Sequence, residues 1–129
     1  MAEHPDLYQV SIRFDALHFS RAALTLNLLV RGGSGEITGS GEISRSLSPV
    51  TPPAHIFQLT GHVQPGQSED VLQVHVSGDY VESAPPPAIG SFVGPFSASC
   101  VVDKQWGGQG TFSYGRYNVG RCVVTRIGE

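Results

Sequence analysis

Apolar and polar side chains alternate along much of the chain, which is the period-two pattern of a β-strand with one buried face. Residues 35–44 show it most clearly, because the polar side chains fall on one side and glycine or isoleucine on the other. Residues 22–30 suit a helix by composition, but strict alternation and the glycine pair that follows favour a strand. Strands are predicted at 7–14, 22–30, 35–44, 55–63, 71–80, 91–102, 111–117 and 119–127.

The predicted strands follow one another through short connections rich in glycine and proline. Strands that are sequential neighbours usually pair, and an up-and-down meander of about eight strands closes into a barrel that leaves no exposed edge. The sequence therefore predicts a single all-β domain over residues 7–129, an antiparallel up-and-down barrel, after a loose leader at 1–6. A two-sheet β-sandwich is the alternative.

A short unit recurs in these strands, in which an apolar residue is followed by Thr or Ser and then by glycine. It places Gly39, Gly61 and Gly78, and a looser version places Gly94, on the apolar side of their strands. Glycine on the inner face allows the strands of a small barrel to bend without overfilling its interior. We therefore expect these glycines inside the barrel, and the same alternation predicts Phe57 on the inner face.

Composition narrows the function classes. The chain has 129 residues, of which only 15% are charged, and its net charge is −3. It lacks the basic excess of a nucleic-acid-binding protein, an apolar run of membrane-spanning length and the pattern of a signal peptide. The expected compartment is the cytoplasm, with export by a route that needs no cleaved signal left open.

Residues able to ligate metals or act as nucleophiles are few and scattered. Cys100 is predicted to point inward and Cys122, placed across from Gly115, to lie on the opposite face, so that two free thiols are expected. His62 and His75 share the outward face of one predicted hairpin and lie about diagonally, but two histidines do not complete a metal site.

The hairpin that carries these histidines has two predicted registers. The first pairs His62 with Gln73 and Thr60 with His75, and the second is displaced by two residues. No pair of carboxylates is close enough for acid/base catalysis, and the sequence predicts neither a metal nor a cofactor.

Two aromatic features are candidate contact sites. The glycine-rich loop at 103–110 presents a tryptophan that can close a barrel mouth, anchor a partner or pack back onto the barrel end. Tyrosine and arginine side chains near the last hairpin suit ligand or protein contacts, although strands with such residues also pair in this way routinely. The predicted binding residues are Trp106, Lys104, Tyr114, Arg116 and Tyr117.

The glycine-rich run at 33–41, followed by the Phe-Gln-Leu-Thr-Gly run at 57–61, is similar to small closed barrels of the avidin and allene-oxide-cyclase kinds. The chain as a whole resembles an uncharacterised bacterial all-β family of unknown function. These resemblances imply the architecture and bring no ligand motif with them.

The leading hypothesis is a non-catalytic binding or interaction module that uses an apolar interior or the loops at 45–54, 82–90 and 103–110. Its partner would be a protein or a small apolar ligand. An isomerase- or cyclase-like enzyme would need an inward polar group with a shifted pKa. A structural subunit would oligomerise through a strand face. A cavity beside Tyr80, Phe96 or Tyr114 would favour binding or catalysis inside the barrel.

Overall fold

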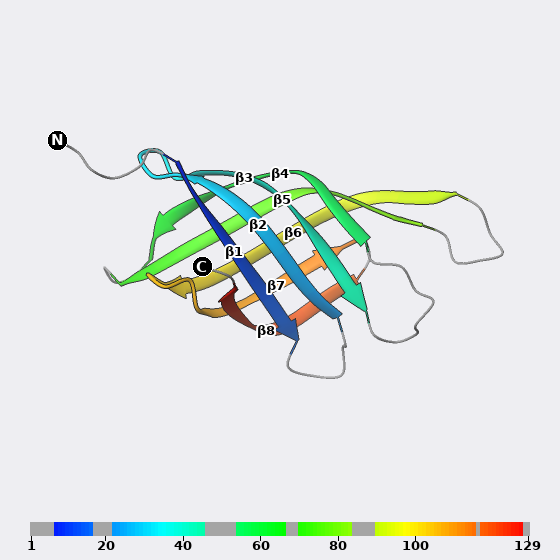
Figure 1. The fold of residues 1–129 in the computed structure, drawn as a ribbon. Coiled ribbons are helices and arrows are strands. Elements are labelled where there is room, and N and C mark those ends of the chain that lie inside the picture. The colour runs from blue at the N-terminus through cyan, green and yellow to red at the C-terminus, as the bar shows by residue number, and fades with distance from the viewer. Residues whose placement is uncertain are drawn as a thin grey trace.

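The computed structural model describes residues 7–16, 22–45, 54–66, 70–83, 90–115 and 117–127. They form a closed antiparallel barrel in which each strand pairs with its neighbours in sequence and β8 pairs with β1 (Figure 1). The predicted barrel is thus confirmed and the sandwich is excluded. The strands are β1 (Leu7–Ala16), β2 (Ala22–Arg31), β3 (Glu36–Arg45), β4 (Ala54–Pro65), β5 (Val71–Ser83), β6 (Ser91–Asp103), β7 (Gly108–Tyr114) and β8 (Tyr117–Ile127).

Parts of the sequence-based predictions fall outside the described residues. These are the leader at 1–6, Arg116, and most of the two proline-rich loops, at 46–53 and 84–89. The hairpin of β5 and β6 extends beyond the rest of the barrel on the side of the second loop (Figure 1).

The barrel interior is packed with the apolar side chains that the alternation predicts. Phe14 and Phe96 are the largest of the fully buried side chains, and every strand contributes to the same cluster. Closure of β1 on β8 places Phe14 beside Val124, so that the apolar faces of the first and last strands are continuous. Among the described residues no polar or charged side chain is buried. Burial of apolar surface is therefore the main force that holds the strands together.

The hairpin of β4 and β5 takes the second of the two predicted registers. His62 pairs with His75, and Thr60 pairs with Ser77. The two histidines therefore lie directly opposite one another, and not diagonally.

One strand is irregular where the alternation predicts regularity. The register of β4 shifts between Phe57 and Thr60, and Gln58 adopts a left-handed backbone with φ of 54°. This bulge inserts an extra residue and reverses the alternation on one side of it. Ile56 is buried and Phe57 is 38% exposed. The predicted inward position of Phe57 is therefore wrong.

A second bulge corrects the prediction for the cysteines. The register of β7 with β8 shifts between Gly110 and Phe112, which pairs Gly110 with Cys122. Gly110 also pairs with Cys100, so both cysteines are buried on the inner face, two strands apart. Two strand spacings are about 9–10 Å, too far for a disulfide without backbone movement. Both thiols are free.

The repeated glycines lie within strands and have buried cross-strand neighbours, as predicted for the inner face. Gly61 lies between Ile37 and Val76, both 1% exposed. A Cβ atom added to Gly61 would overlap the carbonyl oxygen of His75, and one added to Gly39 would overlap a carbonyl oxygen of β2. Only glycine allows adjacent strands to approach this closely at these two positions.

Candidate functional site

Trp106 is part of the core and not an exposed anchor. Its side chain is 3% exposed and packs in the main apolar cluster. Asp103 Oδ1 accepts hydrogen bonds from the backbone amides of Gln105, at 2.9 Å, and Gly107, at 3.1 Å, which fixes the turn. Trp106 itself has φ of 65°. The loop at 103–110 is shorter than predicted because β7 begins at Gly108, and its tryptophan packs back into the core.

The other predicted site residues do not gather around Trp106. Lys104 is an exposed side chain whose Nζ lies 3.7 Å from the Asp70 carboxylate. Tyr114 is 2% exposed at the opposite end of β7, where its ring stacks on Phe112 with centroids 6.2 Å apart. Tyr117 pairs with Tyr114 through the backbone of β8. The described members of the predicted site therefore do not form one surface.

A ligand site inside the barrel receives no support from the described part of the chain. Of the two best-formed hollows in the described part of the chain, neither is lined by Tyr80, Phe96 or Tyr114. All three side chains are buried within the core cluster. An apolar ligand held among these side chains therefore has no support from the packing.

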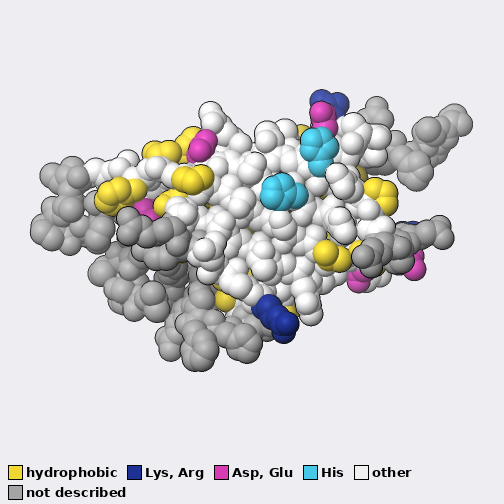
Figure 2. Space-filling model, turned by 180° about the vertical axis from the view of Figure 1, so that it is seen from behind, with side chains coloured by type: hydrophobic (Ala, Val, Ile, Leu, Met, Phe, Trp, Pro, Cys, Tyr) yellow, Lys and Arg dark blue, Asp and Glu magenta, His cyan; other side chains and the backbone are white. Residues whose placement is uncertain are grey.

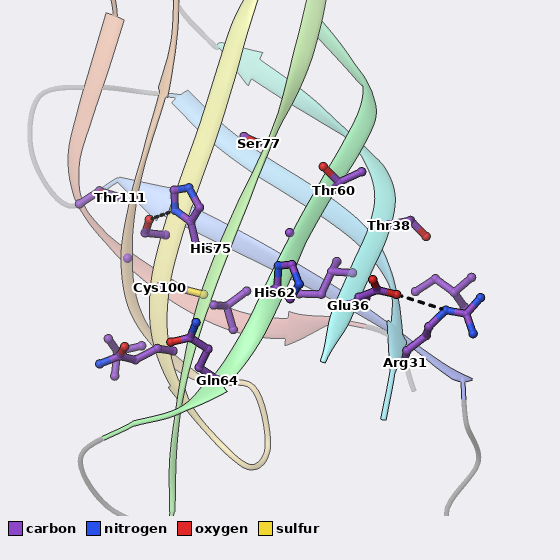
Figure 3. Close-up of a pocket in the computed structure, with 18 of the residues that line it drawn as sticks. Arg31, Glu36, Thr38, Thr60, His62, Gln64, His75, Ser77, Cys100 and Thr111 are labelled. Carbon is purple, nitrogen blue, oxygen red and sulfur yellow. Dashed lines mark hydrogen bonds and ion pairs between the residues drawn. The ribbon is translucent and has the colours of Figure 1, made fainter. Parts of the chain in front are cut away.

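The larger hollow, of about 810 Å³, lies on the outer face of the barrel. We call it the outer trough. It crosses β3 to β7 and continues onto β2, over a face where histidine side chains lie among mostly uncharged groups (Figures 2 and 3). The exposed apolar side chains of Leu7 and Val101 also line it. Its exposed hydrogen-bonding side chains are Thr38, Thr60, His62, Gln64, Gln73, His75, Ser77, Ser99, Gln109 and Thr111.

The pairing of neighbouring strands brings together, on this surface, residues that are far apart in sequence. One cross-strand row consists of hydroxyl side chains, and its members are Thr38, Thr60, Ser77, Ser97 and Ser113. A neighbouring row, which we call the histidine row, consists of Glu36, His62, His75, Ser99 and Thr111. Successive members of a row are spaced by about 4.8 Å, the distance between strands.

The rows are partly held in place by their own hydrogen bonds. The Nδ1 atom of His75 lies 2.7 Å from Ser99 Oγ, and the hydroxyls of Ser97 and Ser113 are 3.1 Å apart. A second hollow of about 250 Å³ shares Ser99 and Thr111 with the trough and extends it toward β8. The hydrogen-bonding surface thus continues across most of the barrel wall.

The trough is nearly uncharged. Its charged lining residues are Arg31 and Glu36, which face each other at one end at 3.8 Å, and none of the described residues that line it is Phe, Tyr or Trp. Cys100 also lines it, but burial of the thiol raises its pKa to about 12, which suppresses the nucleophilic thiolate. Within the described residues no three His, Cys, Asp or Glu side chains are grouped closely enough to hold a metal. The trough can donate and accept hydrogen bonds, but it lacks an assembled catalytic group.

Most of this surface was not among the sequence-predicted site residues. Thr60, His62, Gln73 and His75 were recognised as one outward strand face, whereas Thr38, Ser77, Ser99 and Thr111 were not singled out. These residues could be found from the sequence by taking the outward-facing positions of five consecutive strands and pairing the strands in the correct register.

Comparison with models of known protein families gives no match, and a search of curated proteins finds no significant similarity. In the segments that the structure describes, no helix is long and apolar enough to cross a membrane.

Proposed function

We propose that this protein is a non-catalytic interaction module that binds an uncharged, extended segment of a protein partner in the outer trough. The observation that supports this proposal is the contrast between the two sides of the barrel wall. The inner side is packed with apolar side chains, and the outer side carries a hollow of about 810 Å³ with exposed hydroxyl, amide and imidazole groups.

A polypeptide suits this surface better than a sugar or a nucleobase. Short Ser and Thr side chains, and a floor that includes Gly61 and Gly110, allow a main chain to approach closely. Peptide N–H and C=O groups are matched by side chains such as Thr60, Gln73 and Ser77, which donate and accept. A sugar or a base would ordinarily stack on an aromatic platform, and the described part of the trough lining has no Phe, Tyr or Trp.

An isomerase- or cyclase-like enzyme receives no comparable support. Such an enzyme would need an inward polar group tuned for proton transfer. Among the described residues the inward titratable groups with shifted pKa are Cys100, Cys122 and Tyr8, and burial raises the pKa of all three, which keeps them protonated. Two buried free thiols also agree with the proposed cytoplasmic location, since that compartment keeps thiols reduced.

The proposal is tested by selecting binding peptides from a random library displayed on phage, with the full-length protein as bait. Thr60→Arg fills the centre of the trough with a charged side chain. Thr125→Arg is the matched control, because Thr125 is an exposed threonine on β8 that lines neither hollow. Selected peptides should bind Thr60→Arg at least about tenfold more weakly and bind the control as they bind the unmodified protein.

Equal binding to the two variants, or failure to select any peptide, would refute the trough as a peptide site. Native mass spectrometry of the protein purified from its source addresses the structural-subunit alternative. A stable oligomer that Thr60→Arg dissociates would show that the occupant of the trough is a second copy of the chain.

A further inference from the structure

The centre of the outer trough holds two imidazoles on facing positions of adjacent strands. His62 on β4 pairs directly with His75 on β5, and both side chains are exposed. Facing residues on one side of an antiparallel pair have Cβ atoms about 5 Å apart. Two imidazoles at that separation can rotate toward a shared ion.

The backbone hydrogen bonds define the geometry around His62. The amide of Val63 donates to the carbonyl oxygen of Gly35 at 2.8 Å, so Val63 faces β3 with its backbone groups. By alternation His62 faces β5, which makes His62 and His75 a hydrogen-bonded pair with Cα atoms about 5.5 Å apart. On its other side His62 pairs with Glu36 in the narrower type of pair, with Cα atoms about 4.5 Å apart.

One of the imidazoles is already held in orientation. His75 Nδ1 lies 2.7 Å from Ser99 Oγ, which leaves its Nε2 atom available to a ligand (Figure 3). Metal-binding histidines are characteristically oriented in this way, through a hydrogen bond made by the ring nitrogen that does not bind the metal. Ser99 thus stands where an orienting group would be needed.

We propose that His62 and His75 form a two-histidine chelate for a divalent first-row transition metal, with Cu²⁺ bound more tightly than Ni²⁺ or Zn²⁺. Imidazole nitrogen suits these ions, and the order follows from the general preference of nitrogen ligands. Because the described residues contain no ready cluster of three ligands, water completes the coordination. This proposal does not depend on the nature of the polypeptide partner.

The test is calorimetric titration of the full-length, tag-free protein with CuCl₂ and NiCl₂. His62→Ala and His75→Ala should each weaken binding at least about tenfold, since even orienting groups around a metal are worth 10–100-fold. His55→Ala is the matched control, because His55 is an exposed imidazole on the same strand and is 3.6 Å from Glu42. His4→Ala and His18→Ala complete the set.

Ser99→Ala should also weaken binding, by a smaller factor, because it releases the His75 ring without removing a ligand. Paramagnetic broadening by Cu²⁺ should be strongest at the imidazole NMR signals of His62 and His75. Binding that is insensitive to both histidines, binding that is lost in the His4, His18 or His55 variants, or the absence of binding below millimolar metal would each overturn the proposal.

Discussion

Replacement of Gly61 by alanine tests the physical basis of the barrel. A Cβ atom at this position would overlap the carbonyl oxygen of His75 and lie 2.7 Å from the Cα atom of Val76. Both atoms belong to the backbone of β5, so no side-chain rotation can relieve the overlap. The strands would have to separate where Gly61 fits between two buried neighbours.

The magnitude follows from comparison with alanine at Gly120. Overpacking a well-packed site costs about 1–3 kcal/mol, and a clash with main chain belongs at the upper end, about 3 kcal/mol. Gly120 lies in β8, is exposed and has no atom within 4 Å of an added Cβ. Gly120→Ala should therefore stabilise the protein by about 0.5 kcal/mol, through the lower entropy of the unfolded chain. The unfolded-state effect is similar in both variants and cancels in the comparison.

Gly94→Ala provides an intermediate case. Its added Cβ would lie 2.9 Å from Cε1 of Tyr80, a side-chain atom that can move. The expected order of stability is therefore Gly120→Ala, then Gly94→Ala, then Gly61→Ala, with the first and last about 3 kcal/mol apart. Since 1 kcal/mol corresponds to about 4 °C for a domain of this size, Tm should differ by about 12 °C.

Urea unfolding measures the free energies directly, and a constant m-value would show that the variants unfold from the same barrel. If Gly61→Ala were within 1 kcal/mol of Gly120→Ala, the close approach of β4 and β5 could not be a requirement of the fold. Glycine would then be merely tolerated at this position.

Four further predictions concern single features of the structure. Trp106 is the only tryptophan, and its burial predicts a blue-shifted native fluorescence that moves to the red on unfolding; a native spectrum like that of the unfolded chain would contradict its position. Gln58→Gly should raise the free energy of unfolding by up to about 1 kcal/mol by relieving the positive φ, and a lower urea midpoint would contradict this. Burial raises the pKa of Cys100 from 9.0 to about 12 and that of Cys122 to about 11, so stability should be full below pH 9 and fall as pH rises toward 12. The double alanine variant of these cysteines should lose that part of the alkaline slope in urea midpoints. Val93 is 65% exposed, and in this part of β6 no described residue of β7 pairs with the strand, which leaves an open edge. Val93→Lys should therefore reduce concentration-dependent light scattering without lowering Tm.

The strands were predictable because each has one buried face, which imposes the alternation that sequence analysis detects. The bulges were not, because an inserted residue is a local backbone event that alternation cannot register. In β4 the residues Ile56 and Phe57 are both apolar, so the alternation allowed either of them to face inward. The bulge at Gln58, with its left-handed backbone, turns Ile56 inward and Phe57 outward. The same kind of event in β8, where an extra residue lies between Val119 and Cys122, turned Cys122 inward.

The buried tryptophan shows a second limit of local patterns. A glycine-rich loop with Lys104 and Trp106 has the composition of an exposed contact loop. The two hydrogen bonds that Asp103 Oδ1 accepts close this segment into a tight turn and direct the indole inward. The trough was missed for a different reason, since its rows join residues from five strands and depend on every register between them.

The inner-face glycines connect the packed interior with the site proposed on the outer wall. Gly61 lies between buried residues on the inner face, and it also lines the trough together with Gly110. Where an inner position has no side chain, the strand can move toward the barrel axis, which removes space inside and makes a depression outside. At Gly61 this displacement would contribute to the hollow on the outer wall. Of the repeated glycines, Gly61 lines the outer trough, the surface where we propose that the partner binds, so a residue that carries no chemistry of its own helps to shape that surface.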